Sequence, residues 1–579
     1  MQNLDHLRHS CAHLLAAAVI KLWPEAKPTI GPSIENGFYY DFDFGSTKIS
    51  ETDLPKIEQE MKTLVKEWKS FDRIEVSNEE AKKQFKDDPY KLELIEELIK
   101  KKEPITFYKS GEFVDLCRGG HIDHPNNRVK HFKLLSIAGA YWRGDEKNTM
   151  LTRIYGTCFP TVKELEQYLW QMEEAKKRDH KKLGKELDLF LISDEVGPGL
   201  LIWTPKGATI RRQIEKLIIS EQIKRGYQHV NTPHIGKKSL WVTSGHWDLY
   251  RDKMYAPMKI DDTEYLVKPM NCPMHMMVYK NKQHSYRDLP VRIAEDATVY
   301  RYEQTGELAG MTRVRHITQD DSHIFCTKEQ VKEEFIGVLD YTKFLLDKFN
   351  ITDYSFRLSL RDPANKNKYL GDDKIWEEAE NAIEKAIQST HVPYDKKEGE
   401  AAFYGPKLDV MIKDALGRNW QCGTIQIDFM LPERFNLEYI DENGEVKRPA
   451  LIHRAPLGSL ERFVGLLIEH YAGKFPVWLA PVQIELIPIS DRHQEYAKLV
   501  KQALLKREIR VELDNRSETM QAKIRDATLQ KIPFTAIIGD KEVEAAKGKE
   551  ESDWVVSVRN LDGQNIGPKT LKELLELLV

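Results

Sequence analysis

The most informative segment of this sequence reads His453-Arg454-Ala455-Pro456-Leu457-Gly458-Ser459-Leu460-Glu461-Arg462. Here a glycine and a serine precede an apolar helical pattern, and Arg462 falls in its first turn. A glycine at this point lets a polyphosphate approach the N-terminus of a helix, and the planar guanidinium of arginine suits phosphate oxygens. Because neither a Walker A loop nor a dinucleotide fingerprint occurs where it would be needed, nucleotide binding here must be of another type.

A second arginine-bearing segment lies upstream. Tyr300-Arg301-Tyr302-Glu303 precedes a polar loop, 304–310, and then Arg313-Val314-Arg315. This pattern predicts strand, loop and strand, with Arg301 and Glu303 on one face of the first strand because side chains alternate. A carboxylate between two arginines can orient them or bind Mg²⁺. Ordinary surface ion pairing is the alternative, and these residues alone leave both interpretations open.

Length and composition indicate a soluble, multidomain chain. The 579 residues allow roughly four domains, and 41% hydrophobic with 31% charged residues excludes a disordered or fibrous protein. No apolar run is long enough for a membrane helix, and residues 14–20 lack the flanks of a signal peptide. The net charge of −4 combines 87 basic and 91 acidic residues, so it does not exclude nucleic acid. Six cysteines indicate a reduced, cytoplasmic compartment.

The periodicity divides the chain into three regions and a connector. Residues 1–160 read as a compact α/β unit, with helical patterns at 4–22, 53–69 and 79–101 and strand-like runs at 38–42 and 105–108. Residues 161–186 give a single charged helical pattern that ends in the basic stretch 176–182. That helix is either a solvated connector or one that also contacts a phosphate backbone.

The last two regions differ in pattern. Residues 187–479 are rich in strand patterns, tryptophan and proline, whereas residues 480–579 alternate strands and helices. The expected strands are 482–489, 509–513, 534–538 and 554–558, and the expected helices are 494–507, 517–530 and 569–578. Such alternation predicts βαβ units and a mostly parallel sheet.

Histidine pairs mark the first region. His9 and His13 are one helical turn apart on one face, and Cys117 and His121 have the same spacing on a loop with two glycines. Such a set could hold zinc, but Ser10 occupies the position of the glutamate that a zincin helix requires, so the metalloprotease interpretation fails. Each pair alone is more often structural. Similar isolated clusters surround Cys272, His323 and His453, and their spacing does not show that they converge.

Together and in this order, these motifs resemble the bacterial threonyl-tRNA synthetases, a family of class II aminoacyl-tRNA synthetases, over essentially the whole chain. The resemblance rests on Met270-Asn271-Cys272-Pro273, Arg313-Val314-Arg315, Gln319-Asp320-Asp321-Ser322-His323-Ile324-Phe325, Phe403-Tyr404-Gly405-Pro406-Lys407, Trp420-Gln421-Cys422-Gly423-Thr424 and the segment 453–462.

The resemblance implies an α/β editing domain at 1–160, a linker helix at 161–186, a class II catalytic domain at 187–479 and an α/β anticodon-binding domain at 480–579. The catalytic domain would be an antiparallel sheet with helices, and it would form a homodimer through residues 226–233. The implied reaction activates L-threonine with ATP and Mg²⁺ to threonyl-adenylate and esterifies the 3′ end of tRNA(Thr), in the cytoplasm and with no membrane.

The family's catalytic residues have matches in this chain. Arg301 would bind the α-phosphate, Glu303 and Arg313 would position the ATP, and Arg462 would clamp the γ-phosphate. Lys407 is a further catalytic match. His246 matches a histidine implicated in the transfer step, as a general base or for orientation.

Cys272, His323 and His453 match the three protein ligands of one Zn²⁺ per subunit in the family. The resemblance implies that the open coordination positions of this ion bind the threonine amine and hydroxyl. Valine is an isostere without that hydroxyl, and an apolar pocket alone separates such isosteres only about 100-fold. The threonine contacts would be Gln319, Asp321, Tyr404 and Gln421.

Serine keeps the hydroxyl and lacks one methyl group, a difference of about 1–3 kcal/mol, so a second, hydrolytic site is expected. His9, His13, Cys117 and His121 match the family's editing residues, which hydrolyse seryl-tRNA. Further editing matches are Lys91, Tyr40 and Asp115. The resemblance implies water-mediated deacylation without a bound metal, in place of the first, zinc-like interpretation. The anticodon contacts would include Asn515, Arg525 and Arg559.

The sequence departs from the family pattern in three places. On this resemblance we expect it to begin at the editing domain and to lack the small ubiquitin-like domain of many bacterial members. His316-Ile317 replaces a pair whose aromatic residue would stack on adenine, so Ile317 is expected to provide an apolar floor. The motif Asn515-Arg516-Ser517-Glu518 departs from the commonest family sequence in the anticodon domain. The alternatives from other classes are a non-catalytic RNA-binding paralogue that regulates translation and a stand-alone metallohydrolase built on the N-terminal histidines.

Overall fold

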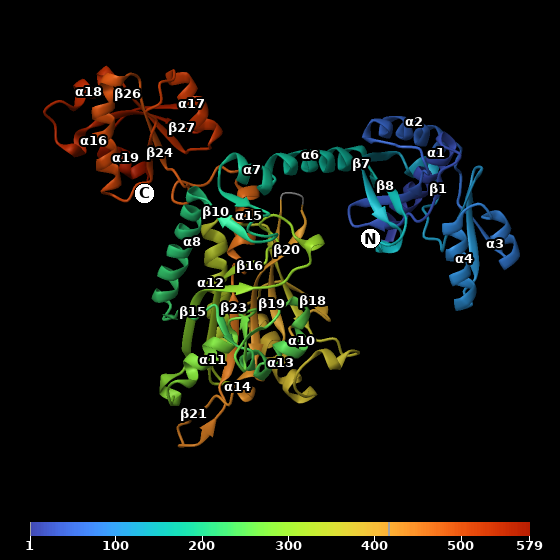
Figure 1. The fold of residues 1–579 in the computed structure, drawn as a ribbon, viewed down its shortest axis with the longest axis horizontal. Coiled ribbons are helices and arrows are strands. Elements are labelled where there is room, and N and C mark those ends of the chain that lie inside the picture. The colour runs from blue at the N-terminus through green and yellow to red at the C-terminus, as the bar shows by residue number, and fades with distance from the viewer. Residues whose placement is uncertain (1, 415–416, 579) are drawn as a thin grey trace. The chain divides into compact units, whose positions relative to one another are not determined.

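The computed structural model describes residues 2–414 and 417–578. The chain divides into two compact units, the first ending at Glu173 and the second beginning at Glu174 (Figure 1). Within the described residues, no helix combines the length and the apolar character that a membrane span requires.

An antiparallel sheet and two helices form the main layer pair of the first unit. The strand order is β1-β3-β8-β7, with β2 paired to β3. The bounds are β1 Lys27–Pro28, β2 Ser33–Ile34, β3 Gly37–Asp43, β7 His131–Tyr141 and β8 Met150–Phe159, with α1 Gln2–Leu22, α2 Leu54–Leu64 and the short α5 Pro125–Arg128. Buried side chains of α1, α2 and the long strands make one hydrophobic core.

A smaller sheet, β4-β5-β6, carries two helices and a core of its own. Its elements are β4 Asp72–Val76, β5 Ile105–Ser110, β6 Phe113–Leu116, α3 Asn78–Gln84 and α4 Pro89–Lys101. The single helix expected at 79–101 is therefore two. The second helix begins anew because Asp88 caps it, accepting the N–H groups of Tyr90 and Lys91 at 3.0 Å each.

The connector is also two helices, α6 Val162–Arg178 and α7 His180–Glu186. The single helix expected over 161–186 is wrong at Asp179. The Asp179 carboxylate accepts the N–H groups of Lys181 and Lys182 at 2.9 and 3.0 Å, so it starts a second helix.

The catalytic region is built on the predicted antiparallel sheet, with strand order β11-β15-β16-β23-β20-β19-β17-β18. All neighbouring pairs from β15 to β17 are antiparallel, whereas the outer strands β11 and β18 pair in parallel. The bounds are β11 Gln228–His229, β15 Val291–Tyr300, β16 His316–Cys326, β23 Ala450–Ala455, β20 Asn419–Asp428, β19 Lys407–Lys413, β17 Tyr354–Leu360 and β18 Tyr394–Glu398.

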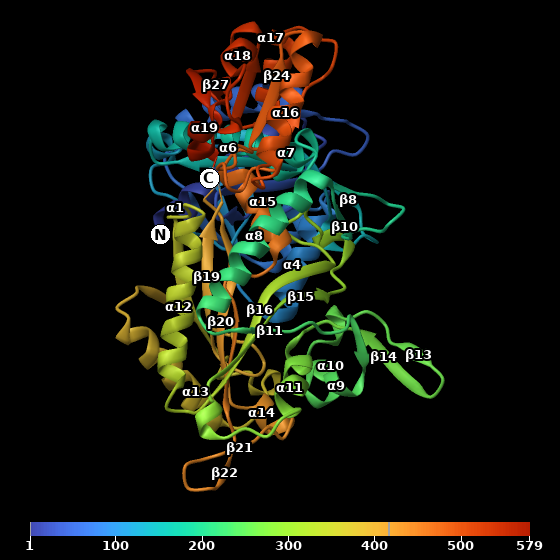
Figure 2. The ribbon, with the colours of Figure 1, turned by 90° about the vertical axis from the view of Figure 1, so that its left-hand side faces the viewer.

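Helices cover one face of this sheet, as Figure 2 shows for α8 and α12. They are α8 Pro205–Lys224, α12 Val331–Lys348, α13 Asp373–Ser389 and α15 Leu460–His470. Along β16, Ile324 and Cys326 belong to the core beneath the helices. Because side chains alternate along a strand, Gln319, Asp321 and His323 project from the opposite face.

Shorter elements surround this sheet. They are the hairpin β9 Phe190–Ile192 and β10 Leu201–Trp203, the small sheet of β12 Ile235–Lys237, β13 Met258–Ile260 and β14 Thr263–Val267, the pair β21 Tyr439–Ile440 and β22 Val446–Lys447, and the helices α9 Ser239–Thr243, α10 His246–Leu249, α11 Cys272–Lys280 and α14 Leu431–Arg434.

The expected strands around Arg301 and Arg313 are wrong. β15 ends at Tyr300 and β16 begins at His316, so Arg301, Glu303 and Arg313 all lie in the connection. Glu303 turns towards Arg313 and Lys253, with N–O distances of 3.2 and 2.9 Å. Arg301 instead approaches Pro269 O at 3.4 Å. The two side chains therefore do not share a strand face.

The C-terminal region has the strand order β25-β24-β26-β27-β28. Its strands are β24 Ile484–Pro488, β25 Val511–Leu513, β26 Phe534–Ile538, β27 Val555–Asn560 and β28 Asn565–Thr570, with helices α16 Gln494–Leu505, α17 Met520–Leu529, α18 Asp540–Ala546 and α19 Leu571–Leu578. The expected mostly parallel sheet is only half correct. β24 pairs in parallel with β25 and β26, but β27 and the unpredicted β28 are antiparallel.

Candidate functional site

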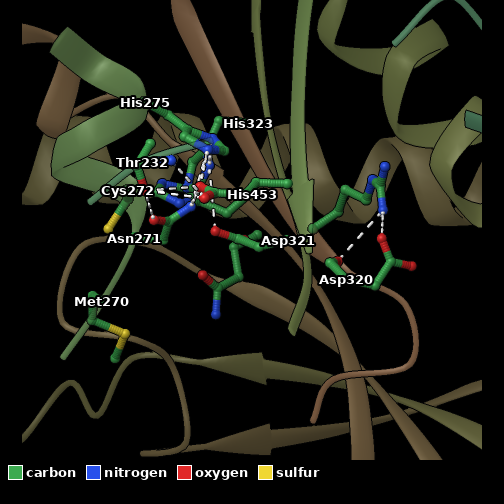
Figure 3. A network of polar contacts seen from close by, with 12 residues as sticks. Thr232, Met270, Asn271, Cys272, His275, Asp320, Asp321, His323 and His453 are labelled. Atoms are coloured by element: carbon green, nitrogen blue, oxygen red, sulfur yellow. Dashed lines mark hydrogen bonds and ion pairs between the residues drawn. The ribbon is translucent and has the colours of Figure 1, made fainter. Parts of the chain in front are cut away.

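Three separated segments bring Cys272, His323 and His453 together. His323 on β16 and His453 on β23 are direct cross-strand partners, so both imidazoles leave the same face of the sheet. Cys272 is the first residue of α11. The candidate ligand atoms all lie within 4.8 Å of one another, and Figure 3 shows the three side chains gathered in one network. All three residues are buried, between 1% and 5% exposed.

Hydrogen bonds orient both imidazoles. His453 Nε2 lies 2.9 Å from the Asp428 carboxylate, so Nε2–H donates and Nδ1 is left for a metal ion. His323 Nδ1 lies 2.8 Å from Nδ1 of His275 (Figure 3), and one of these two nitrogens must carry a proton. The residue behind His275 decides which one.

Glu295, on β15, is that residue. Its Oε2 lies 3.2 Å from His275 Nε2. Burial alone would raise the pKa of Glu295, but hydrogen bonds from His275, the Thr232 N–H and Asn271, with the charge of Lys268, lower it to about 2. Asn271 Nδ2, an amide donor to Glu295 Oε2 at 2.9 Å, is also 3.0 Å from His275 Nε2. The ionised Glu295 carboxylate is the acceptor beside that nitrogen, so we assign the His275 proton to Nε2. His323 Nδ1–H then donates to His275, and His323 Nε2 faces the ligand cluster.

The protonation states suit a cation. Burial first, and then the neighbouring histidines His453 and His275, hold the pKa of His323 well below its usual range, so its imidazole is neutral. Burial and the carboxylates of Asp321 and Asp428 raise the pKa of the Cys272 thiol well above its usual range. A divalent cation would lower the pKa of this thiol again, because it stabilises the thiolate. One thiol and two oriented, neutral imidazoles therefore form a donor set that fits zinc.

A cavity of about 490 Å³ opens in front of these side chains. This volume suits a small-molecule ligand. Of the predicted site residues, those that line the cavity are Arg301, Arg462, Gln319, Asp321, Tyr404, Gln421, Cys272, His323 and His453. Ile317 also lines it, whereas the ring of His316, on the other face of β16, lies with its centroid 5.4 Å from that of the Tyr300 ring.

Arg462 is fixed at one end of this cavity. Its Nε donates to Thr312 O and its Nη1 to Gln421 O, both at 2.8 Å. The turn before α15 approaches β20 so closely that a Cβ on Gly458 would lie 1.9 Å from Cys422 O, and the φ of Gly458 is +62°. Only glycine fits this turn, and it brings the helix start and Arg462 to the cavity.

Four predicted catalytic residues do not line the cavity. Glu303 and Arg313 pair with each other at 3.2 Å. Lys407 is buried against Asp409, which also accepts a hydrogen bond of 2.7 Å from Gln421 Nε2. His246 is fully buried behind the ligand cluster, with Nε2 3.9 Å from Cys272 Sγ. Burial, with the charges of His453 and Arg301, lowers the pKa of His246 to about 3, so its ring is neutral.

The first unit holds a second cluster, built from the N-terminal histidines. His9 Nε2 is 3.1 Å from Cys117 Sγ, and His121 Nε2 is 3.4 Å from the same sulfur. The ring of His13 lies edge-on to both other imidazoles. Ser10 accepts the N–H of Ile122 at 2.9 Å, so the residue that rules out a zincin ties the 117–122 loop to α1. These four side chains are also close enough to hold a metal ion.

Lys91, Tyr40 and Asp115 form a buried network behind this cluster. Lys91 Nζ lies 2.5 Å from Asp115 Oδ1, and the Tyr40 hydroxyl donates to Asp115 Oδ2 at 2.6 Å. Asp115 also approaches His13 Nδ1 at 3.4 Å. Burial, followed by His13 and His9, lowers the pKa of His121 to about 2, whereas burial raises that of Cys117 to about 11. The cluster is therefore a neutral, polar site rather than a thiolate nucleophile.

The three residues predicted to contact the anticodon lie in different places. Asn515 lines a cavity of about 460 Å³ at the end of β25. Arg525 lies on the surface beside Asp526 at 3.3 Å, and Arg559 belongs to β27, paired with Thr535 of β26. The cavity lining instead includes Arg516 and several acidic residues. Burial and the charges of Asp514 and Glu512 raise the pKa of Glu485, one of these acidic residues, to about 7.

Sequence reasoning missed the residues behind the ligands. His275, Glu295, Asn271 and Asp428 carry no predicted role, although Asn271 lies in a quoted motif. One signal was present, because Gln426 and Asp428 alternate with isoleucines in a buried strand, where polar side chains need partners.

Comparisons with known families match each region. The description "tRNA synthetase class II core domain (G, H, P, S and T)" matches residues 255–471. "Anticodon binding domain" matches 483–579, and "Threonyl and Alanyl tRNA synthetase second additional domain" matches 105–155. Each match lies inside the corresponding expected region.

Relatives of the whole chain include threonine–tRNA ligases. That of Sulfurihydrogenibium sp. (strain YO3AOP1) is 52% identical over 95% of this chain and 86% of its own length. That of Streptococcus thermophilus (strain LMD-9) is 50% identical over 99% of this chain and 87% of its own length.

Among solved structures, a threonyl-tRNA synthetase RNA-binding domain from Cryptosporidium parvum matches with a TM-score of 0.64 and 39% identity, over 69% of this chain and 97% of that one. The putative threonyl-tRNA synthetase ThrRS-1 of Aeropyrum pernix matches with a TM-score of 0.59 and 31% identity, over 69% and 94%.

Proposed function

The chain belongs to the threonyl-tRNA synthetases, a family of class II aminoacyl-tRNA synthetases, and from this membership we propose how it joins L-threonine to tRNA(Thr). One observation carries the proposal. A single cavity has Cys272, His323 and His453 in one part of its wall and Arg301 and Arg462 in another. An amino acid and an ATP can therefore meet inside it, which supports a catalytic enzyme over a non-catalytic RNA-binding paralogue.

The arginines act on the ATP. Threonine activation requires its carboxylate to attack the α-phosphorus while pyrophosphate leaves. Such chemistry depends mainly on positioning and on stabilising charge. Arg301 binds the α-phosphate and Arg462 the γ-phosphate, while Glu303 and Arg313 hold the edge of the ATP site. Mg²⁺ enters with the ATP, as the partner of its phosphate oxygens.

Cys272, His323 and His453 would hold one Zn²⁺ per subunit, and the ion would bind the amine and hydroxyl of threonine when present. Around it, Asp321, Gln319 and Gln421 bind the polar groups of threonine. Tyr404 is fixed by its hydroxyl, which donates to Gln426 at 2.7 Å. Valine is rejected because it lacks the hydroxyl. Lys407 acts through Asp409, which holds Gln421, and His246 assists transfer from behind Cys272.

The second site, in the first unit, hydrolyses seryl-tRNA(Thr). His9, His13, Cys117 and His121 bind the ester and a water molecule, and Lys91, Tyr40 and Asp115 fix the position of His13. The family resemblance supports a metal-free reaction, whereas the close approach of the four side chains is compatible with a metal ion. Metal analysis of a Cys272→Ser variant separates these outcomes, because zinc retained there and lost in His9→Ala would place a metal in the first unit.

The remaining partners follow from the family. tRNA(Thr) binds the C-terminal region near Asn515, and a second copy of the chain pairs through residues 226–233. The cytoplasm is the proposed compartment. It is supported by the six cysteines, which are all free thiols in the described part of the chain.

The test is threonine-dependent exchange of pyrophosphate into ATP by zinc-replete protein. We expect exchange in the wild type and its loss in Cys272→Ser, together with about one zinc per chain. Cys422→Ser is the matched control, because Cys422 lines the same cavity outside the ligand cluster, and it should retain the zinc. Zinc-replete wild-type protein without exchange would refute the proposed function.

A further inference from the structure

His180 is an unusual residue for its surroundings. It lies in the basic stretch 176–182, where its neighbours Lys176, Lys177, Lys181 and Lys182 are exposed, yet His180 itself is only 5% exposed. It is the first residue of α7, and the Asp179 cap fixes the start of that helix. The break in the connector therefore turns one imidazole into the interior of the second unit.

Both ring nitrogens of His180 are engaged. The N–H of Met311 donates to His180 Nε2 at 3.2 Å, so Nε2 is the unprotonated acceptor. Nδ1 then carries the proton and donates to the Glu469 carboxylate at 2.7 Å, which also accepts the backbone N–H of His180 at 3.3 Å. The imidazole thus joins α7 to the C-terminal turn of α15 and to the connection between β15 and β16.

That connection leads directly to the ATP end of the cavity. Met311 is fully buried, and the next residue, Thr312, provides the carbonyl that accepts Arg462 Nε at 2.8 Å. Close packing leaves little freedom here. A Cβ on Gly310 would lie 2.4 Å from His180 Nε2, and a Cβ on Gly465 of α15 would lie 3.1 Å from Met311 Cβ. Any shift of Met311 would therefore move the carbonyl that holds Arg462.

We propose that His180 is a positioning residue for ATP, holding residues 309–313 against α15 so that Thr312 fixes the Arg462 guanidinium at the cavity. This inference rests on the proposed function, in which Arg462 binds a phosphate of ATP. His180 touches neither substrate. It acts through Met311 and Thr312, and the acceptor nitrogen Nε2 is the part of its ring that matters.

Two substitutions of similar size separate the two ring nitrogens. In His180→Gln, the amide reaches the position of Nε2 and its oxygen can accept the Met311 N–H. In His180→Asn, the amide reaches only the position of Nδ1, so it can donate to Glu469 but leaves Met311 unpaired. Losing one such hydrogen bond corresponds to roughly a five- to tenfold effect. Lys182→Ala is the control, because Lys182 is an exposed neighbour on the same helix.

We expect His180→Asn to raise the KM for ATP in threonine-dependent exchange roughly five- to tenfold, with KM for threonine and zinc content unchanged. His180→Gln and Lys182→Ala should stay within about twofold of the wild type. Gly310→Ala, whose methyl group would displace the imidazole, should raise the KM for ATP as His180→Asn does. It serves as the second probe if His180→Asn folds poorly.

Calorimetric titration with Mg·ATP measures the same affinity without catalysis, so a wild type that lacks exchange would refute the proposed function and still leave this inference measurable. An unchanged ATP affinity in both His180→Asn and Gly310→Ala would overturn the inference. So would the reverse order, with His180→Gln impaired and His180→Asn normal, because the Glu469 bond would then be the important one.

Discussion

At the scale of single residues, the nitrogen of His323 that is free for the proposed metal ion is selected by a residue outside the cavity wall. The ionised Glu295 holds the proton of His275 on Nε2, and His275 Nδ1 then accepts the proton of His323 Nδ1, across distances of 3.2 and 2.8 Å. A carboxylate behind a metal-binding histidine commonly orients the ring and raises its basicity. Here one additional imidazole extends that relay.

Substitutions at His275 test this relay. His275→Asn places an oxygen near the position of Nδ1 and keeps the acceptor for His323, whereas His275→Gln places its amide near Nε2 and removes that acceptor. We expect zinc affinity to fall roughly 10–100-fold in His275→Gln and far less in His275→Asn, measured by competition with a chromophoric chelator. Equal affinities in two variants with matching melting temperatures would contradict the relay.

The sequence alone predicts the candidate ligands but not the residues that support them. Cys272, His323 and His453 are predicted from motif resemblance, since their spacing of 51 and 130 residues carries no metal signature. His275 and Glu295 were missed because their role depends on the pairing of β15 with β16, which places Glu295 opposite Asp321. Such cross-strand neighbours are set by sheet register, which a single sequence does not display.

At the scale of elements, α4 shows how a helix start places a buried charge. Asp88 caps the helix, so Lys91 lies in its first turn and reaches Asp115 and the Tyr40 hydroxyl, at 2.5 and 3.2 Å. Lys91 is 2% exposed, and a buried ammonium requires such partners. The position of the cap therefore determines the network behind His13.

Removing this cap should loosen the helix. Asp88→Ala loses a capping interaction worth about 1 kcal/mol, so hydrogen exchange in the peptide 88–101 should be roughly fivefold faster. Hydrolysis of seryl-tRNA should slow, while threonine activation remains unchanged. Asp87→Ala is the control, because Asp87 is exposed and caps no helix. Equal exchange rates in the two variants would contradict this account.

Periodicity predicted most elements, and it failed where a single polar residue ends one helix and begins the next. The expected helices over 79–101 and 161–186 each break at an aspartate, because the carboxylates of Asp88 and Asp179 satisfy N–H groups that a continuous helix would bond internally. The alternation at Arg301 and Glu303 suggested a strand, but their long side chains satisfy separate partners in an irregular connection. The local sequence pattern does not show which residues these partners are.

At the scale of the whole molecule, each candidate site lies within one unit and on that unit's own core. The histidine cluster belongs to the unit that ends at Glu173, and the ligand cluster belongs to the unit that begins at Glu174. The hydrophobic residues beneath the two sites form separate clusters. A change confined to one site should therefore leave the chemistry of the other intact.

His13→Ala tests this independence. The variant should activate threonine at the wild-type rate, with unchanged zinc content, while seryl-tRNA(Thr) accumulates when serine is supplied. The loss follows because His13 connects the cluster to Asp115 at 3.4 Å. Unchanged clearance of seryl-tRNA(Thr) would remove the editing assignment, and a parallel loss of threonine activation would contradict the separation of the sites.

The central claim is that one cavity selects threonine by its hydroxyl group and activates it with ATP. Pyrophosphate exchange by the zinc-replete wild type, with threonine, serine and valine measured side by side, tests this claim most directly. We predict strong exchange with threonine, weaker exchange with serine, which keeps the hydroxyl, and almost none with valine. Exchange with valine comparable to that with threonine, or no exchange with threonine, would contradict the account.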